Sequence, residues 1–553
     1  MIFQEVFDRF VRRRPIAVMF RALLDNVFSA EKIDAIFRAS RRSQRDSKEL
    51  LFSSVVRLLG LAVCRVKSSV HAGYRDEQEK FQVSVNSVYG KLDKAEPQVA
   101  QALVRQPAAE LESIIRQLKT TRPAPLPGYR MKILDGKHFS ATDHRIAETQ
   151  DSNSAPLPGQ AIAVLDPELM LVTDVFPCED GHAQERSILP EVLETVEAGQ
   201  LWMGDRNFCT TGFVFGIANR NAYFLIRQHK QNLYWTPVGR RRRIGRSETG
   251  VVYEQTVRLM DSDADDADEL TVRRVTIVLD TPTRDGDTEI HLLTNVPSED
   301  ADAIRIASLY LDRWTIENVF QEISTALNGE INTLAYPSAA ILGFCIALIA
   351  FNILSTVKAA LRVEHGEDAS PKKISGYHLA DEIASAYDGM MVALPERYWA
   401  EDFGSLTPAQ MARTLIRLSK NVARPQNLWV KTTRRQEEIG LKTVLAMMGD
   451  QSPKPPGILR IDAGGKLARG EAVVGQLGKR GRPSRPPTCL QPLGRRSGCF
   501  PAEPYPPPRP KAIVSDEATW DTGAKRGRIF RRSFSETFGQ GLSRGIHPRS
   551  VSW

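Results

Sequence analysis

Apolar residues recur at three- and four-residue spacing through the first 120 residues, in stretches such as FDRFVRRRPIAVMFRALLDNVF and SKELLFSSVVRLLGLAV. This spacing is typical of amphipathic α-helices, whose apolar stripe packs against a core. The same segment is rich in Arg and Lys. The pattern predicts a helical domain over residues 1–120. Its basic faces make it a candidate DNA-binding domain, although core packing alone explains the apolar stripes.

After the breaker TTRPAPLPGYR the pattern changes to short apolar runs of strand length. MKILDG (131–136), LWMGDRNF (201–208) and AYFLIRQ (222–228) each predict a strand, and the first two runs carry an acid at the end of the strand. QAIAVLDPELMLVTDVFP (160–177) predicts a hairpin around the turn DPE. SILPEVLETVEAG and TTGFVFGIANR predict helices. This order of strands and helices indicates a mixed α/β domain that begins over 128–228.

Residues 229–300 have a different pattern, in which strand-like runs alternate with polar runs. LYWTPV, VVYEQTVRLM, LTVRRVTIVLD and EIHLLTNV predict strands, and the polar runs RRRRIGR and DSDADDADE predict loops between them. The acidic run lacks the glycine and the terminal glutamate of a calcium-binding loop, so we interpret it as a solvated loop. This part of the chain is predicted to be an inserted β-rich subdomain.

Residues 310–320, YLDRWTIENVF, predict a helix on which Tyr310, Arg313 and Glu317 share one stripe. The plain interpretation is a surface helix with an Arg313–Glu317 ion pair, worth a few tenths of a kcal/mol. The most apolar run of the chain, AAILGFCIALIAF (339–351), predicts a buried core helix, because about 13 residues are too few to cross a bilayer. Further helices are predicted to about residue 450.

Composition narrows the class of protein. The 553 residues are 42% apolar and 25% charged, as in ordinary globular proteins. The six cysteines are scattered and form no C-x-x-C pair, which argues against a disulfide framework or a zinc module and favours a reducing cytoplasm. The N-terminal residues lack a sustained apolar stretch, so no cleaved signal peptide is predicted. We expect a cytoplasmic protein without a membrane segment.

The net charge of +8 is unevenly distributed: +7 over residues 1–120, −11 over 121–450 and +12 over 451–553. Basic ends suit a polyanion such as duplex DNA, although they also aid solubility. Residues 451–553 are rich in Pro, Gly and Arg without periodicity and predict a disordered basic tail. Within the tail, KRGRP (479–483) resembles a minor-groove-binding AT-hook. Read-through past a damaged stop codon would give the same composition.

The acids suggest chemistry. Asp135 and Asp205 follow short apolar runs, and acids at strand ends converge on one edge of a sheet. Glu317 arrives on a helix that packs against that sheet. Three such carboxylates repel one another unless cations neutralise them, and oxygen ligands of this kind suit Mg²⁺ or Mn²⁺. Two ions can drive an in-line phosphoryl displacement. The alternative is that each aspartate is only a turn residue.

Together these motifs resemble the DDE transposases of the bacterial insertion-sequence-four type. That family has a helix pattern Y-x2-R-x3-E-x6-K, a first aspartate in a strand of the form ILDG and a second that opens a D-x-x-F/Y pattern. The matching residues are Asp135, Asp205, Tyr310, Arg313 and Glu317. The family also has a β-rich insertion before the glutamate, in the position of residues 229–300. The resemblance covers roughly residues 10–450.

The resemblance implies an α/β protein with a ribonuclease-H-like catalytic core that a β-rich insertion interrupts, an N-terminal helical domain and a disordered basic C-terminal tail. The expected domains are 1–120, helical; 128–228, first part of the core; 229–300, insertion; 301–450, second part of the core with the following helices; and 451–553, tail.

For the site, the resemblance implies Asp135, Asp205 and Glu317 as catalytic ligands of two Mg²⁺ or Mn²⁺ ions. Tyr310 and Arg313 are expected to contact DNA, and an aromatic residue of the insertion holds a flipped base. Trp235 is our candidate for that residue, with Tyr234 beside it. The partners implied are the terminal inverted repeats and target DNA, bound by a homodimer at the nucleoid of a bacterial cytoplasm.

One position departs from the family. The pattern expects lysine at position 324, where it contacts phosphate, and this chain has Ser324. Cut-and-paste transposition is the leading interpretation from the resemblance, but this departure leaves two alternatives. One is a catalytically decayed DNA-binding relic; the other is a nuclease on the same scaffold.

Overall fold

The computed structural model describes residues 2–43, 48–119, 122–142, 159–229, 233–261, 269–283, 286–366, 372–422 and 429–431. All of these belong to one compact unit, Met1–Leu459. The predicted tail, with KRGRP, and most of the acidic run after residue 261 lie outside the described residues.

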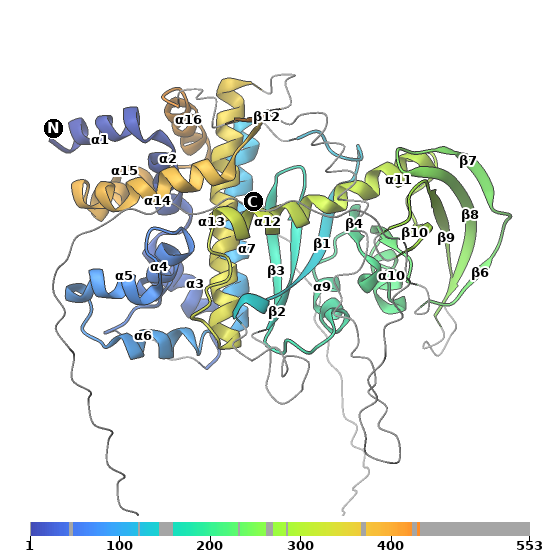
Figure 1. The fold of residues 1–553 in the computed structure, drawn as a ribbon, viewed down its shortest axis with the longest axis horizontal. Coiled ribbons are helices and arrows are strands. Elements are labelled where there is room, and N and C mark those ends of the chain that lie inside the picture. Colours follow the sequence, from blue (N-terminus) through green and yellow to red (C-terminus); the bar gives the residue numbers. More distant parts are fainter. Residues whose placement is uncertain are drawn as a thin grey trace, which may run out of the picture. The chain divides into compact units, whose positions relative to one another are not determined.

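Helices make up the first part of the chain, as the apolar spacing predicted. They are α1 (Ile2–Arg13), α2 (Pro15–Val27), α3 (Ala30–Ser40), α4 (Phe52–Val63), α5 (Val70–Asp76), α6 (Val85–Leu92) and α7 (Pro97–Leu118), with a 3₁₀ turn at Gln78–Lys80. Helices from the other end of the chain, α14 (Gly376–Ala393), α15 (Glu396–Phe403) and α16 (Pro408–Ser419), pack against α2, and α16 also packs against α7. The two ends of the described chain thus form one helical body (Figure 1).

The middle of the chain forms a ten-stranded sheet. Its strands are β1 (Arg130–His138), β2 (Gln160–Asp166), β3 (Leu171–Cys178), β4 (Gln200–Gly204), β5 (Tyr223–Arg227), β6 (Trp235–Pro237), β7 (Arg242–Arg246), β8 (Gly250–Met260), β9 (Glu269–Leu279) and β10 (Glu289–Thr294). The order is β3-β2-β1-β4-β5-β10-β9-β8-β6, and β7 pairs with β8. A short pair, β11 (Lys372–Ile374) with β12 (Trp429–Lys431), is separate. The predicted hairpin is confirmed as β2–β3.

Strand directions divide the sheet in two. β4 runs parallel to β1 and to β5, whereas β2 and β3 run antiparallel to their neighbours. From β5 outward, β10, β9, β8 and β6 pair antiparallel. The strands that come between β5 and β10 in the sequence therefore extend the same sheet beyond β10. In Figure 1 this antiparallel part lies at the opposite end of the described unit from the helical body.

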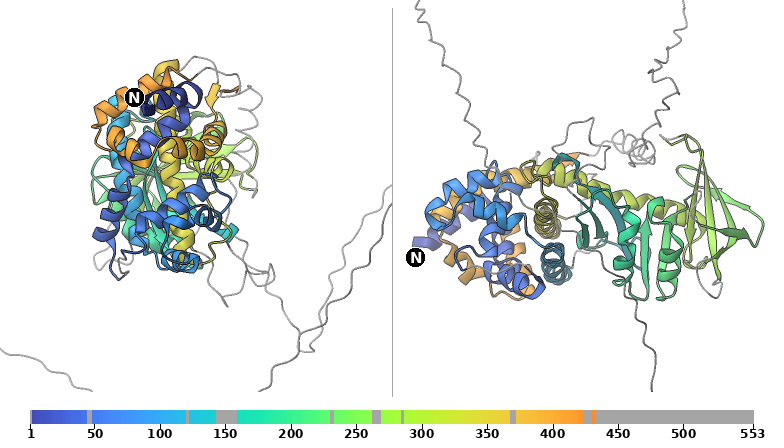
Figure 2. Two further views of the ribbon diagram at one scale, coloured as in Figure 1. Left: turned by 90° about the vertical axis from the view of Figure 1, so that its left-hand side faces the viewer. Right: turned by 90° about the horizontal axis from the view of Figure 1, so that it is seen from below.

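Both faces of the β1–β4–β5 region are covered by helices. Alternate residues of β1 divide between two apolar clusters: Ile133 packs with α7, α12 (Trp314–Ala326) and α13 (Pro337–His365), and Leu134 packs with α9 (Leu189–Leu193) and α10 (Thr211–Ala218). This alternation follows from the two-residue period of a strand. The right-hand view of Figure 2 shows helices on either side of these strands.

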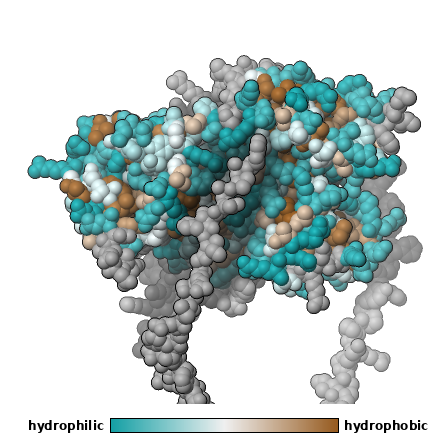
Figure 3. All heavy atoms as spheres, turned by 180° about the vertical axis from the view of Figure 1, so that it is seen from behind, coloured by the Kyte–Doolittle hydropathy of each residue, from teal (hydrophilic) through white to brown (hydrophobic). Residues whose placement is uncertain are grey.

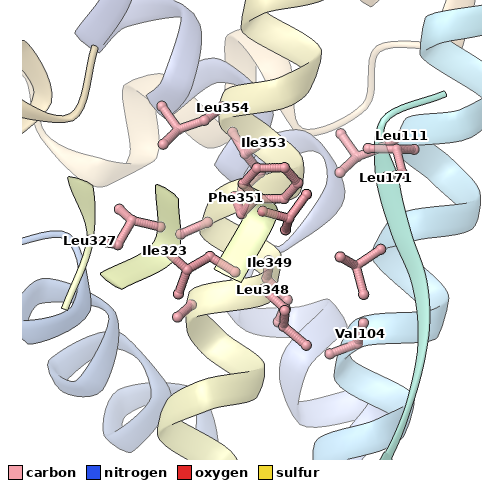
Figure 4. Packing of buried hydrophobic residues seen from close by; sticks show 14 of the residues in the cluster. Val104, Leu111, Leu171, Ile323, Leu327, Leu348, Ile349, Phe351, Ile353 and Leu354 are labelled. Carbon is pink, nitrogen blue, oxygen red and sulfur yellow. The ribbon is translucent and has the colours of Figure 1, made fainter. Parts of the chain in front are cut away.

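Helix α13 is the centre of the larger cluster. Figure 4 shows Leu348, Ile349 and Phe351 of α13 among apolar side chains of α7 and α12. Its 29 residues are long and apolar enough to cross a membrane by length and composition, but its apolar window is wholly buried. Our prediction of a buried helix is confirmed, although the length argument for it was wrong. A polar side chain also holds this buried helix against β3. The Asn352 side-chain amide accepts a hydrogen bond from the Val172 N–H and donates one to the Val172 carbonyl oxygen.

Two predictions about strands were wrong. RRRRIGR was expected to be a loop, but Arg242–Arg246 is strand β7. Among the described strands, β7 pairs with β8 alone, and it is exposed along most of its length, so no apolar alternation marks it in the sequence. MKILDG was expected to end at its acid and glycine, but β1 continues to His138, because β2 remains paired with it after β4 has ended.

The helix predicted over residues 310–320 is not continuous. It consists of α11 (Ala303–Tyr310), a 3₁₀ turn at Leu311–Arg313, and α12. A tighter turn therefore separates Tyr310 from α12. Arg313 nevertheless interacts with both Tyr310 and Glu317, so the three side chains still gather at one place. Outside these buried elements, the face in Figure 3 is mostly hydrophilic, with only scattered apolar patches.

Candidate active site

The first two aspartates lie on neighbouring strands at the level where β4 ends and β1 continues. The parallel register pairs Ile133 of β1 with Met203 of β4, so two residues further along, Asp135 stands opposite Asp205. Ile133 and Met203 both point into the α12–α13 cluster. Because side chains alternate, Asp135 is directed to the same face as Ile133, at the level where β4 ends and α12 packs against β1.

Asp205 is held by the turn that follows it. Its Oδ1 accepts a hydrogen bond from the backbone N–H of Asn207, 2.8 Å away, and it caps the 3₁₀ turn Arg206–Phe208. Phe208 fills the space behind this turn and is fully buried. The D-x-x-F pattern therefore has a local structural reason, which leaves the second carboxylate oxygen of Asp205 available for another partner.

Glu317 joins this edge through Arg313. The Arg313 Nη2 lies 2.6 Å from Glu317 Oε1, and its Nη1 lies 3.5 Å from Asp135 Oδ1. The predicted i,i+4 ion pair exists, but it is not a surface pair, because the Arg313 side chain is only 8% exposed. One guanidinium thus bridges a carboxylate on β1 and a carboxylate on α12.

The electrostatics show an excess of negative charge. Burial raises the pKa of Asp135 well above its usual value, and the nearby Asp205, Glu317 and Glu185 raise it further, against the opposing effect of Arg313. Burial also raises the pKa of Glu317. Burial alone would lower the pKa of Arg313, but Tyr310 and the facing carboxylates hold it above its usual value, so the guanidinium stays charged. A single cation does not compensate the cluster.

Arg313 lies between Asp135 and Glu317 and supplies the positive charge there. Among the described residues, no three His, Cys, Asp or Glu side chains already stand together as a metal site. The donor chemistry nevertheless fits a hard divalent cation, since all three side chains offer carboxylate oxygens at one edge of the sheet. Asp135, Asp205 and Glu317 could therefore hold Mg²⁺ or Mn²⁺ once Arg313 releases one or both of its contacts.

The two predicted aromatic residues lie at different places, Tyr310 behind Arg313 and Trp235 far along the sheet. Tyr310 is buried at 2% exposure, packs edge-on to Trp314, and has a pKa raised to about 12 by burial. It supports the site from behind and presents no surface to a ligand. Trp235 is half-buried on β6, six strands from β1 in the sheet order, with the Arg274 guanidinium 4.6 Å from its ring centroid. The structure does not bring Trp235 to the acids of its own chain.

A cation does reach position 324, from a distant part of the sequence. Ser324 is exposed on α12, and the Arg65 Nη2 lies 3.3 Å from its carbonyl oxygen and 2.9 Å from that of Leu327. Arg65 follows α4 in the left-handed backbone conformation, with φ at 58°. The neighbouring backbone is locked as well, because Asn328 N–H donates to Val63 O at 2.8 Å.

Sequence reasoning missed three charged residues: Glu185 and Lys137 beside the acids, and Arg65 at the end of α12. Lys137 lies two residues after Asp135, hence on the same face of β1, and its Nζ is 2.6 Å from Glu330. Glu185 begins the 3₁₀ turn Glu185–Ile188 after the hairpin. A strand alternation argument could have found Lys137, but nothing in the sequence marks Arg65 or Glu185.

Residues 126–353 match the sequence model of the transposase DDE domain. The matched segment contains Asp135, Asp205 and Glu317. A second similarity, at 36% identity over 135 residues, is to the protein described as "Putative transposase y4zB" from Sinorhizobium fredii. It covers 24% of this chain and 35% of that protein, so the chain spans about a third of the length of this curated relative.

Proposed function

We propose that this chain is a transposase that cleaves DNA at the inverted repeats of its own element and joins the ends to target DNA, in a metal-dependent cut-and-paste reaction. The observation that carries the proposal is the meeting of Asp135, Asp205 and Glu317 at one sheet edge within a segment similar to the transposase DDE domain. We further assign it to the insertion-sequence-four type, with Tyr310, Arg313 and Glu317 as its helix signature.

The proposed scaffold is a ribonuclease-H-like core. The order β3-β2-β1-β4-β5, with β1, β4 and β5 parallel and β2 and β3 antiparallel to their neighbours, supports this assignment. Strands β6 to β9 lie between β5 and β10 along the chain, which supports a β-rich insertion over residues 229–300. We assign the helices of residues 1–120 to DNA binding.

In the reaction, a water oxygen attacks the phosphorus at an element end and the bond from phosphorus to the 3′ oxygen breaks, leaving a 3′-hydroxyl. That hydroxyl oxygen then attacks the phosphorus of the opposite strand, and the bond from this phosphorus to the flanking DNA breaks, which closes a hairpin on the element end and releases the flank. A second water oxygen attacks the hairpin phosphorus, and the bond to the 3′ oxygen breaks again, which regenerates the 3′-hydroxyl. Two Mg²⁺ or Mn²⁺ ions, when bound, activate the attacking oxygen and stabilise the leaving one. Asp135, Asp205 and Glu317 would hold these ions, and Arg313 would then be free to turn from the carboxylates to a phosphate beside the scissile bond.

The experiment uses the full chain and duplexes that end in the inverted repeats flanking its gene. We expect cleavage at the repeat end in Mg²⁺, a hairpin, and joining to a target plasmid. Binding without cleavage would instead identify the decayed relic that Ser324 suggests. Cleavage without preference for the repeats and without joining would identify a nuclease. The homodimer that we propose for the DNA complex is measured on the same duplexes by light scattering.

The antiparallel part of the sheet carries a basic ridge that suits duplex DNA. Arg240, Arg242 and Arg243 are exposed, and within the described part of the chain their side chains have no ion pair or hydrogen bond. Their neighbours Arg241 and Arg246 are already paired with Glu289 and Asp280. Unpaired arginines along an exposed edge are free to contact phosphates.

We expect the triple variant Arg240→Ala, Arg242→Ala, Arg243→Ala to bind DNA more weakly and with less salt dependence. Each arginine that no longer neutralises a phosphate lowers the slope of log K against log salt by about 0.9. Fluorescence anisotropy with a labelled duplex in EDTA, over a series of KCl concentrations, measures the slope independently of catalysis. The matched control is Arg258→Ala, a partly exposed arginine already paired with Glu269. An unchanged slope in the triple variant would remove the ridge from the DNA interface.

We retain Trp235 as the residue that stacks on a base flipped from the hairpin end, with Tyr234, 74% exposed, beside it. On pre-nicked ends, Trp235→Ala is expected to reduce hairpin closure while the first nick on intact ends stays normal. Gel analysis of both products decides the assignment, with Tyr253→Ala, a β8 aromatic under Arg241, as the control for strand packing. Equal loss of nick and hairpin would indicate a purely structural role.

A further inference from the structure

Arg65 brings a positive charge from the N-terminal helices to the end of the helix that carries Glu317. Its Nη2 lies 2.9 Å from the carbonyl oxygen of Leu327 and 3.3 Å from that of Ser324, in the last turn of α12. A helix leaves its last carbonyls without a partner of its own. Arg65 therefore caps α12 from a distant part of the sequence.

Capping does not use the whole charge of Arg65. The C-terminus of a helix carries about half a negative charge, whereas a guanidinium carries a full positive one. The Arg65 side chain is exposed, and among the described residues it forms no ion pair, and its Nε and Nη1 have no hydrogen-bond partner. Two lysines close to α12 are, by contrast, already paired. Lys137 pairs with Glu330, and Lys358 pairs with Glu322.

The backbone around Arg65 fixes its position. Arg65 follows α4 with φ at 58°, a left-handed conformation that favours glycine. Hydrogen bonds hold the chain on both sides, from the Asn328 N–H to the Val63 carbonyl oxygen at 2.8 Å and from the Lys67 N–H to the Leu61 carbonyl oxygen at 3.1 Å. Strain that the surrounding structure holds in this way gathers at ligand-binding positions. The chain thus keeps an arginine where glycine would be less strained.

The exposed face of α12 runs from the acids to Arg65. Glu317 and Ser324 are seven residues apart, so they lie about 10.5 Å apart along the helix axis and about 20° apart around it. The Ser324 hydroxyl donates to the Phe320 carbonyl oxygen of its own helix, 2.9 Å away. The exposed residues of this helix are polar and uncharged: Asn318, Gln321, Ser324 and Thr325. A DNA strand that leaves the acids along this face meets uncharged side chains and then the Arg65 guanidinium.

The length of this face corresponds to a few nucleotides. Successive nucleotides of a strand rise about 3.4 Å, so about 10.5 Å spans about three of them. A guanidinium fork matches the oxygens of a phosphate. We propose that Arg65 binds a backbone phosphate of the element end about three nucleotides from the scissile bond, and so supplies the positive charge that Ser324 does not. The inference rests on the proposed function, because the DNA is the strand held at the same acids.

The test measures binding of the full chain to a labelled repeat-end duplex in EDTA, by anisotropy over a series of KCl concentrations. Arg65→Gln keeps a donor for the carbonyls of α12 but removes the charge. Loss of one phosphate contact lowers the slope of log K against log salt by about 0.9, so between about 50 and 200 mM KCl its affinity should fall about 3.5-fold less than that of wild type. Arg413→Gln, an exposed arginine of α16, is the matched control and should keep the wild-type slope.

Uncharged methylphosphonates, placed at one position of the duplex at a time, locate the contact. With wild type, the analogue at the phosphate bound by Arg65 should weaken binding, and with Arg65→Gln the same analogue should cause no further loss. Adding Ser324→Lys to Arg65→Gln puts an ammonium group on α12 itself and should restore the slope. A purely structural role of Arg65 would give neither the coupling to one phosphate nor the rescue.

A second variant covers the case in which Arg65→Gln does not fold. Arg65→Gly suits the left-handed backbone and should show the same lower slope. An unchanged slope in either folded variant, or a lower slope without coupling to any phosphate, would overturn the Arg65 contact, while cleavage by the wild-type chain would leave the proposed function standing. Coupling without cleavage would keep the contact and overturn the proposed function. A chain that does not bind the duplex would overturn both.

Discussion

Replacing Asp135 or Asp205 by Asn, or Glu317 by Gln, is expected to reduce metal-dependent strand cleavage by more than about a thousandfold, while affinity for the same duplex in EDTA changes little. Each substitution removes a negative metal ligand but no phosphate contact, and groups that act as a unit in catalysis fail together. Cleavage is measured on end-labelled repeat duplexes in Mg²⁺, and binding is measured by anisotropy on the same duplexes.

Glu322→Gln is the matched control, because it lies five residues after Glu317 on the same helix, about 140° around its axis. Its carboxylate pairs with the buried Lys358 on α13, away from the acids. We expect this variant to keep cleavage and to lose stability, because the lysine is left buried without its partner. Near-normal cleavage in any one of the three site variants would exclude that residue from the site.

Arg313→Ala is expected to destabilise the metal-free chain by about 3 kcal/mol, since removing one partner of a buried pair leaves uncompensated charge. The loss should be larger at pH 8 than at pH 5. The raised pKa of Asp135, caused mainly by burial, means that this group takes up its proton in the fold at a higher pH than when unfolded. A protonated Asp135 does not need the guanidinium, so the penalty falls as pH falls.

Mn²⁺ should narrow this deficit, because a cation that binds only the folded chain stabilises it and replaces the charge of Arg313. Urea unfolding with and without Mn²⁺ at both pH values measures the effect. Arg313→Lys is the control: it keeps the charge but cannot bridge both carboxylates, so it should fall between wild type and Arg313→Ala. Equal stability of Arg313→Ala and wild type at pH 8 would show that the ion pairs of Arg313 do not stabilise the fold.

The parts of the fold that are predictable from sequence are those with a strong apolar period. The hairpin and α13 were predictable because β2 is buried throughout and α13 is buried around its circumference. Strand β7 was not, because an exposed edge strand of arginines carries no alternation. The break in the helix at Leu311–Arg313 was not predictable either, since the residues of a 3₁₀ turn there differ little from those of a helix.

The acids were recognisable as candidates because short apolar runs precede Asp135 and Asp205. The strand register that brings the two aspartates together was not predictable, because the pairing of Ile133 with Met203 depends on the whole sheet and not on a local segment. The same limit applies to Arg65, which reaches the carbonyl of Ser324 across 259 residues of sequence. It also applies to the burial of Tyr310, whose hydroxyl had suggested an exposed role.

The central claim is that Asp135, Asp205 and Glu317 form a divalent-cation site for DNA chemistry. The most direct measurement is anomalous scattering at the manganese absorption edge from crystals of the full chain grown with MnCl₂ and a repeat-end duplex. The account predicts manganese peaks at coordination distance from Asp135, one shared with Asp205 and one with Glu317, and Arg313 moved from the carboxylates toward a phosphate. Ordered DNA without manganese at Asp135, and with Arg313 still bridging the two acids, would contradict it.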